Sequence, residues 1–328
     1  MTAATPRTAF PVVAPEAAAE PPGALPLTVP TFGASGVYMD TPVSIEVVAP
    51  AASVCEAAVA RAFGWFEEVE ARCSRFDQDS EISALSRWVG VPVAVSPLVF
   101  RVVEFALAVA RDSGGAFDPT LGHAMEARGF DHNYRTGRRV SARVDAGAGS
   151  WRDVELDPAR RAITLRRPLV LDLGAVAKGF AIDLAAAELR SFAGFAINAG
   201  GDLYVAGTPG DRPWRVGVRH PRDPGALAAT LLVSDAAVCT SGDYERLDPA
   251  GSDGHHLLDP ATGDAARDVA SVTVVAPAAM LADALGTAAF VMGPRQGLAF
   301  LSRNGVEGLI VSADLARHST AGFSRYEQ

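Results

Sequence analysis

The stretch PLVLDLGAVAKGFAIDLAAAELRSFAGFAINAGGDLYVA, residues 168–206, decides the fold. Residues 168–172 have the apolar character of a buried strand, and residues 174–192 follow with the composition of a helix. Residues 195–198 and 202–206 then alternate as strands do, with two glycines between them. A helix followed directly by consecutive strands favours antiparallel pairing, because only a tight turn separates one strand from the next.

The rest of the chain extends this pattern in both directions. Helical spacing of apolar residues predicts helices at 51–72 and 96–112 near one end and at 277–292 and 294–304 near the other. Strands are predicted at 37–48, 214–219, 228–234, 269–275 and 307–312. Helices near the ends and strands in the middle are typical of an α+β fold with largely antiparallel sheets flanked by helices, not of a doubly wound sheet.

Composition narrows the class of protein. The 328 residues carry a net charge of −9, which argues against a nucleic-acid partner, since that would require a basic face. No segment has the apolar length of an integral membrane span. Residues 1–30 are rich in alanine and proline and are predicted to be a disordered leader, followed by a single domain at 31–328.

The cysteines suggest a compartment. Cys55, Cys73 and Cys239 form neither a disulfide framework nor a zinc-binding pattern, which fits a reducing cytosol. The leader shows no signal-peptide core and no lipoprotein cysteine. We therefore expect a cytoplasmic protein.

Lys178 is the only lysine of the chain and lies just before Gly179. Every other fixed cation is an arginine, whose planar fork differs from the compact, rotatable ammonium of lysine. The hypothesis is that Lys178 meets a phosphate oxygen. The alternative is that a surface lysine was retained by chance.

Asp283 and Thr287 are four residues apart in a predicted helix, so that their side chains share one face. A carboxylate and a hydroxyl side by side suit a hard cation such as Mg²⁺, which prefers oxygen ligands. The alternative is an ordinary helical aspartate beside a threonine that bonds to its own turn.

His256 is a second candidate for chemistry. Adjacent residues of a strand point to opposite faces, so His255 and His256 cannot easily bind one metal. One of them could act as a general base, because imidazole titrates near neutral pH. The alternative is a half-buried histidine without a chemical role.

Two loops could line a ligand site. Thr240 and Ser241 place two hydroxyls before a glycine, where they could bind phosphate or cap a turn. Ala116, Phe117 and Asp118 place an aromatic ring and a carboxylate after a helix. That ring could line a pocket for a flat ligand, or it could belong to the core.

Together these motifs resemble the ApbE-type FAD:protein FMN transferases, from about residue 33 to the C-terminus. The similarity is carried by eight separated blocks, in order Met39-Asp-Thr41, Ser74-Arg-Phe76 with Ser80-Glu-Ile-Ser83, Ala116-Phe-Asp118-Pro-Thr120, Asp172-Leu-Gly-Ala-Val-Ala-Lys178-Gly179, Asn198-Ala-Gly-Gly-Asp202, Thr240-Ser-Gly-Asp-Tyr244, His256-Leu-Leu-Asp259-Pro-Ala-Thr-Gly263 and Asp283 with Thr287.

The resemblance implies an activity, a fold and ligands. The expected reaction transfers FMN from FAD to a threonine or serine hydroxyl of an acceptor protein, which the sequence does not identify, and releases AMP. FAD is then a substrate, and Mg²⁺ is required. The expected architecture is ApbE-like, with a T-fold-like arrangement of sheets and helices.

The resemblance also implies residue roles. It assigns the metal to Asp283 and Thr287 with a backbone oxygen of Ala175, and it makes His256 the activator of the incoming hydroxyl. Lys178, the second catalytic candidate, would neutralise phosphate charge together with the metal and orient the phosphorus. It places the FAD site at Met39, Phe76, Ala116, Phe117, Asp118, Asp172, Lys178 and Leu258.

The chain departs from the family at three places. Phe76 stands where tyrosine is common, Ser86 where asparagine is common, and Gly286 where some members have a further acidic residue. Two other functions remain open. A FAD pyrophosphatase that yields FMN and AMP needs the same metal site, whereas a FAD-binding protein without catalysis needs neither the Asp283–Thr287 pair nor His256.

Overall fold

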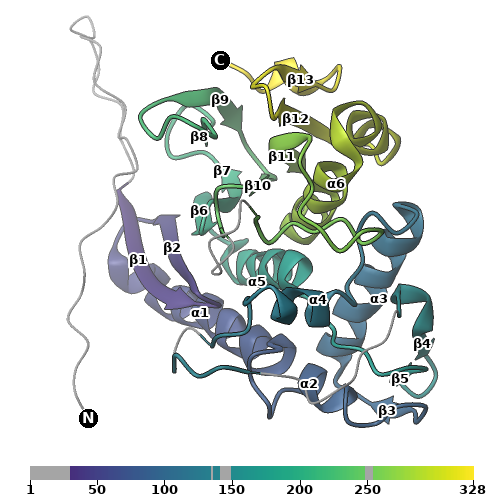
Figure 1. Cartoon of the computed structure of the whole chain (residues 1–328). Coiled ribbons are helices and arrows are strands. Elements are labelled where there is room, and N and C mark those ends of the chain that lie inside the picture. The colour runs from purple at the N-terminus through teal and green to yellow at the C-terminus, as the bar shows by residue number, and fades with distance from the viewer. Residues whose placement is uncertain (1–29, 134–135, 141–148, 248–253) are drawn as a thin grey trace, which may run out of the picture.

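An eight-stranded antiparallel sheet forms the centre of the molecule (Figure 1). The computed structural model describes residues 30–133, 136–140, 149–247 and 254–328, so the predicted leader lies outside the described residues except for Pro30. In spatial order the strands are β1 (Thr31–Tyr38), β2 (Thr41–Val48), β6 (Gly194–Ala199), β7 (Asp202–Gly207), β10 (Ala236–Gly242), β11 (Val269–Ala276), β12 (Glu307–Ser312) and β13 (Arg317–Ser319). Every neighbouring pair is antiparallel, as the sequence predicts.

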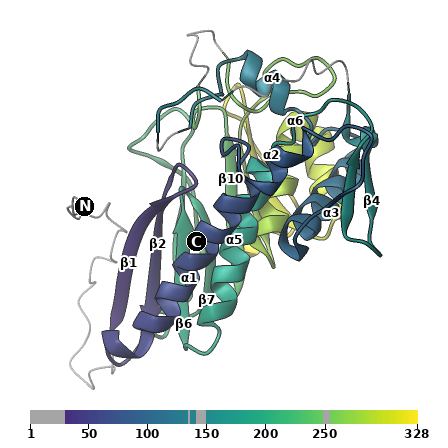
Figure 2. The same ribbon diagram turned by 90° about the horizontal axis from the view of Figure 1, so that it is seen from below.

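Helices cover one face of this sheet. They are α1 (Ala52–Cys73), α5 (Gly174–Leu189) and α6 (Ala279–Arg303), and α3 (Pro97–Asp112) packs beside them. Figure 2 shows α1 and α5 lying side by side along the strands. The two helices predicted at 277–292 and 294–304 are the halves of α6, which bends at Gly293, where φ is 77°, before Pro294.

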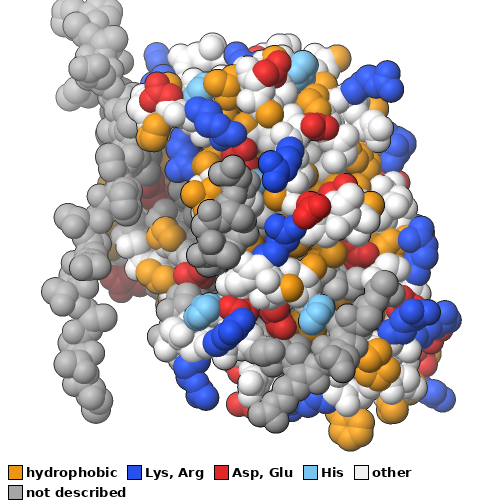
Figure 3. Space-filling model, viewed as in Figure 1, with side chains coloured by type: hydrophobic (Ala, Val, Ile, Leu, Met, Phe, Trp, Pro, Cys, Tyr) orange, Lys and Arg blue, Asp and Glu red, His pale blue; other side chains and the backbone are white. Residues whose placement is uncertain are grey.

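A hairpin of β8 (Trp214–Arg219) and β9 (Leu227–Val233) covers the opposite face. Trp214 and Leu231 belong to a second core that also contains Val238 and Val275 of the central sheet. Because it is covered on both sides, β11 is buried along its whole length. On the face of the molecule drawn in Figure 3, basic and acidic side chains are interspersed.

The remaining elements are small. A second sheet contains β3 (Val93–Ala94), β4 (Val154–Asp157) and β5 (Ala162–Leu165). The short helices are α2 (Glu81–Leu85), α4 (Gly122–Ala127), η1 (Trp151–Asp153) and η2 (Phe323–Arg325). None of the helices that the structure describes has both the length and the apolar character needed to cross a bilayer.

Two predicted strands differ in the structure. Residues 37–48 are not one strand, because Met39 (φ 51°) and Asp40 (φ 60°) turn the chain between β1 and β2 without the usual glycine. Residues 168–172 are mostly buried but pair only through a single bridge between Val170 and Leu121. Because the segment is buried, its residues are as apolar as those of a buried strand, although it lies outside the sheets.

A close contact between α5 and α6 positions the site. A Cβ on Gly179 would lie 2.5 Å from the carbonyl oxygen of Ala279. The carboxylate of Asp183 in α5 accepts the amides of Ala279 (2.7 Å) and Met280 (3.0 Å) at the start of α6. Asp183 therefore caps α6 from the neighbouring helix and holds the two helix beginnings together.

We expect Gly179→Ala to destabilise the protein, because the added methyl group collides with backbone that cannot rotate away. Overpacking of this kind costs about 1–3 kcal/mol of the free energy of unfolding, to be measured by urea denaturation. Gly64→Ala in α1 is the matched control, since a Cβ there meets nothing within 4 Å. The control should stabilise by about 0.5–1 kcal/mol, and equal stability of the two variants would contradict the packing argument.

Candidate functional site

Lys178 is paired with a buried carboxylate. Its Nζ donates to the Asp202 carboxylate at the start of β7, and the Asp202 side chain is 2% exposed. The other oxygen of Asp202 accepts the amide of Thr240 in β10, at 3.0 Å. The Lys178 side chain remains 25% exposed. The ammonium is therefore held at the junction of α5, β7 and β10 while it stays reachable from solvent.

The turn before Asp202 brings the β1–β2 hairpin to the same region. Gly200 (φ 64°) and Gly201 (φ 100°) adopt left-handed backbone, and the Asn198 side chain accepts the Gly201 amide at 2.9 Å. A Cβ on Gly200 would lie 2.6 Å from a methyl group of Thr41. Met39, in the adjacent turn, is half-buried against the main core, so it lies near this end of the sheet.

Asp283 places an unpartnered oxygen in the interior. The residue is 6% exposed, and its Oδ2 is buried without a hydrogen-bond partner. Burial raises the pKa of the carboxyl, although the Lys178 ammonium, the Gly179 amide and the Arg246 guanidinium all act to lower it. A buried carboxylate oxygen without a protein partner is suited to bind a cation, since few such atoms lack a partner in folded proteins.

Hydroxyl and backbone oxygens lie close to that carboxylate. Thr287 follows one turn later in α6, with its Oγ1 3.4 Å from Oγ of Ser241. The Gly179 amide acts on Asp283, and the carbonyl that this amide would bond in a regular helix is that of Ala175. The Gly179 amide of α5 therefore lies beside Asp283, one turn after Ala175 in the helix.

The described residues around Asp283 do not form a cage of charged ligands. The residues that the structure describes contain no group of three or more His, Cys, Asp or Glu side chains able to hold a metal ion. A cation at Asp283 would thus be completed by neutral oxygens and by a ligand. Mg²⁺ is commonly held in this way, by one or two carboxylates together with phosphates and water.

His256 is held by the backbone of Arg246. The His256 amide donates to the Arg246 carbonyl at 3.2 Å, and Nδ1 of the ring lies 3.4 Å from the same oxygen. Burial and the charge of Arg246 lower the pKa of His256 to about 3, so the imidazole is neutral at physiological pH. With its proton on Nδ1 facing the carbonyl, the ring leaves Nε2 as an acceptor.

His255 has a different environment. It is buried, with Nε2 2.7 Å from the Ala266 carbonyl oxygen and its ring edge-on to Phe290. This is the arrangement of a structural histidine, so the two neighbours have separate roles.

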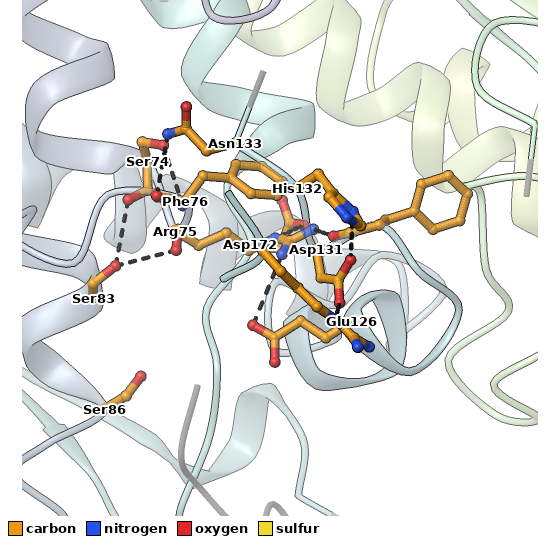
Figure 4. Close-up of polar contacts among 12 residues, drawn as sticks. Ser74, Arg75, Phe76, Ser83, Ser86, Glu126, Asp131, His132, Asn133 and Asp172 are labelled. Atoms are coloured by element: carbon orange, nitrogen blue, oxygen red, sulfur yellow. Dashed lines mark hydrogen bonds and ion pairs between the residues drawn. The ribbon is translucent and has the colours of Figure 1, made fainter. Parts of the chain in front are cut away.

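Asp172 is oriented by a buried arginine, as Figure 4 shows. Its Oδ2 accepts Nε of Arg75 at 2.6 Å, and its Oδ1 accepts the Gly174 amide at 2.9 Å. Burial alone would raise the pKa of Asp172, but the Arg75 charge and the Gly174 amide outweigh burial and lower it. Both carboxylate oxygens are thereby engaged, and the carboxylate fixes the beginning of α5.

Arg75 also supports Phe76. Its guanidinium donates to the Phe130 carbonyl at 2.6 Å and lies 4.0 Å from the centre of the Phe76 ring. Ser86 lies apart from this cluster in Figure 4. Its hydroxyl donates to the Leu169 carbonyl at 2.9 Å. The serine that replaces the common asparagine therefore binds backbone in this chain.

The loop at 116–118 lies next to Asp172, whose amide donates to the Pro119 carbonyl at 2.8 Å. Asp118 accepts the amide (2.9 Å) and hydroxyl (2.7 Å) of Thr120, and burial raises the pKa of its carboxyl. Ala116 is half-buried, whereas Phe117 is buried in the main core.

The candidate residues thus form two adjacent groups. One contains Lys178, His256, Asp283 and Thr287, and the other surrounds Asp172. Arg246 joins them, since its charge lowers the pKa of Asp172, Asp283 and His256. Leu258 is buried two residues beyond His256.

Three contributors were not assigned a role from the sequence. Asp202 and Arg75 lie within the motif blocks but gave no signal of their buried pairing with Lys178 and Asp172. The sequence does not distinguish Arg246 from the many other arginines, and only its position in the structure indicates a role.

Comparison with known proteins identifies the family. The model of the ApbE family matches residues 39–310, and the chain belongs to this family. This confirms the family that the motif blocks indicate.

Solved relatives share the fold. An ApbE protein from Thermotoga maritima superimposes with a TM-score of 0.80 at 30% identity, covering 91% of this chain and 100% of that one. The flavin transferase ApbE of Vibrio cholerae gives a TM-score of 0.75 at 25% identity, covering 90% of this chain and 99% of that one. The predicted α+β, ApbE-like architecture is confirmed.

Curated relatives carry the name FAD:protein FMN transferase. The one from Treponema pallidum (strain Nichols) is 34% identical over 304 residues, which are 83% of this chain and 82% of that protein. The one from Rhodobacter capsulatus is 36% identical over 69% of this chain but only 44% of its own length. The prediction of an enzyme of this family is confirmed.

We expect Asp283→Asn to remove any stabilisation by Mg²⁺. Because the folded pKa is raised, the carboxyl stabilises the fold only at low pH, and this contribution is lost as pH rises through the folded pKa. At pH 8 without Mg²⁺ the variant should therefore melt no lower than wild type. Mg²⁺ at 100 times its Kd should stabilise wild type by about 2.7 kcal/mol and leave the variant unchanged. An equal gain in stability with Mg²⁺ in both proteins would contradict the assignment of the metal to Asp283.

His256 should remain neutral between pH 5 and 8, since its pKa is lowered to about 3. The check is an NMR titration of the imidazole nitrogens in labelled protein, in which the His256 shifts should stay flat and show a protonated Nδ1. The same histidine in urea-unfolded chain should titrate near its ordinary value of about 6.5. A midpoint near that value in the folded protein would show that burial and Arg246 do not act on the ring.

Proposed function

We propose that this chain is a magnesium-dependent FAD:protein FMN transferase. It would move the FMN half of FAD to a threonine or serine hydroxyl of an acceptor protein and release AMP. The observation that carries the proposal is the orphaned, buried carboxylate oxygen of Asp283 beside the Lys178 ammonium. Family membership supports the same activity, since relatives bear this name.

The diphosphate must lose part of its negative charge before an oxygen nucleophile can approach. Asp283 and Thr287, with a backbone oxygen of Ala175, would hold Mg²⁺, which supplies charge neutralisation to phosphate oxygens when bound. Lys178 adds a positive charge within reach of the same region, and Asp202 fixes the direction of its ammonium. These groups would bind the diphosphate and orient its phosphorus.

His256 would act on the acceptor hydroxyl. Its Nε2 accepts the proton as the hydroxyl oxygen bonds to the phosphorus of the FMN half. The bond between that phosphorus and the bridging oxygen breaks, and AMP leaves with the electron pair. The proton then passes from His256 to solvent or product, so that charge and atoms balance.

The flavin would bind beside Asp172. Phe76 is half-buried on the Arg75 guanidinium, which fixes the ring as a flat wall. The half-buried Met39 and Ala116 offer further apolar surface. Phe117, Asp118, Asp172 and Leu258 would shape this site mainly from behind, because each is buried or already hydrogen-bonded within the protein.

Two proposals concern the chain as a whole. One main core reaches from Val43 to Ile310, which supports a single domain over residues 31–328. Cys55, Cys73 and Cys239 are buried free thiols, as expected in a reducing compartment, which supports a cytoplasmic location.

The decisive experiment supplies acceptors without naming one in advance. Purified protein, FAD and Mg²⁺ are added to a lysate from host cells that lack the gene. Released AMP is measured by chromatography and flavin-modified peptides by mass spectrometry. We expect AMP together with FMN linked to threonine or serine. AMP with free FMN alone would indicate the pyrophosphatase, and tight FAD binding without AMP would indicate the non-catalytic protein.

His256→Ala should lower the rate of FMN transfer by about 10²–10⁴-fold, the usual contribution of a general base. FAD affinity, measured by quenching of flavin fluorescence, should change little. His318→Ala is the control, because that histidine is exposed in β13, outside both groups of site residues. Wild-type transfer by the His256 variant would assign the hydroxyl's activation to another group.

A further inference from the structure

Arg246 is anchored to the site through its backbone. Its carbonyl accepts the His256 amide at 3.2 Å, and the next residue, Leu247, pairs with His255 in an antiparallel bridge. The chain at Arg246 is therefore tied to the segment that carries His256. The residue as a whole is exposed.

The Arg246 guanidinium has no hydrogen-bond or ion-pair partner among the residues described by the structure. Nearby arginines are engaged instead. Arg219 pairs with Glu245 at 2.6 Å and stacks on Tyr244, and Arg222 donates two bonds to Asp243 at 2.7 and 2.6 Å. Asp243 and Glu245 are thus occupied by other arginines, and among the described residues no carboxylate forms an ion pair with Arg246.

That charge acts on the site. Arg246 lies close enough to Asp172, Asp283 and His256 to favour the carboxylates and disfavour the imidazolium. Lys178, in contrast, already neutralises the buried Asp202. Arg246 has no such ion pair among the described residues, so its charge would add to that of Lys178 at a bound anion.

We propose that the Arg246 guanidinium binds phosphate oxygens of the FAD diphosphate and is a further catalytic residue of the transfer. The proposal rests on the proposed function. A guanidinium presents a planar fork of donors that matches two phosphate oxygens, and such charge-assisted bonds are among the strongest in proteins. The fork would complement the point charge of Lys178, so that the two cations contact the diphosphate in different ways.

The test separates the diphosphate from the flavin ring. FAD and riboflavin, which shares the ring but lacks phosphate, are titrated against wild type, Arg246→Gln and Arg246→Lys by quenching of flavin fluorescence. We expect Arg246→Gln to weaken FAD binding at least tenfold with riboflavin affinity unchanged, and Arg246→Lys to restore part of the loss. The dependence of FAD affinity on salt should also become shallower in Arg246→Gln, because one ion pair is gone.

Arg219→Gln is the matched control, since it removes a neighbouring arginine whose partner is Glu245. It should bind both ligands as wild type does. Equal FAD affinity in Arg246→Gln and wild type, or an equal loss for FAD and riboflavin, would overturn the assignment. Absence of FMN transfer by a wild-type protein that binds FAD would instead remove the transferase proposal, while the comparison of binding would still decide the role of Arg246.

Discussion

The close approach of α5 to α6 is the constraint on which the site depends. Gly179 permits it, because any side chain there would occupy the position of the Ala279 backbone. Asp183 secures it by capping the first turn of α6. The consequence is that the Gly179 amide of α5 lies against Asp283. A carboxylate from one helix and backbone oxygens from another can then face a common point, which neither helix could provide alone.

Two ion pairs and two charged groups without a described partner surround that point, and the latter two favour binding of a charged ligand. Asp202 and Lys178 neutralise each other, and so do Asp172 and Arg75. Each pair holds a strand or helix end in place, and Asp202 also directs the Lys178 ammonium. Asp283 and Arg246 are left over, one buried without a partner on Oδ2 and the other exposed without one among the described residues. A divalent cation would compensate the first and a phosphate the second, so a magnesium–diphosphate complex matches both.

Much of the fold could be predicted because local patterns dominate it. The α3 helix begins at Pro97, one residue after the start predicted from the spacing of its apolar residues, and the later strands lie where their composition predicts them. The β1–β2 turn was not predicted, because Met39 and Asp40 adopt left-handed backbone without a glycine to indicate it. Segment 168–172 was misread because a buried segment outside a sheet has the same composition as a buried strand.

The site was predictable only where its geometry is local. Asp283 and Thr287 are one helical turn apart, so spacing alone places them together. The partner of Lys178 is 24 residues away, and that of Arg75 is 97 residues away. Such pairs depend on strand order and helix packing, which local periodicity does not encode. The family resemblance filled part of this gap, since its blocks specify which distant segments meet.

The low pKa of His256 makes its strength as a base depend on whether FAD is bound. In the free protein, burial, Arg246 and Lys178 keep the imidazole neutral, with a pKa of about 3. A base that weak removes a proton poorly, because efficient transfer needs a pKa nearer to the working pH. The negative diphosphate, bound by Arg246 and Lys178, would offset the charges that depress this pKa. The ring would become a stronger base when the electrophile is in place, so that binding of FAD itself would prepare the attack on it.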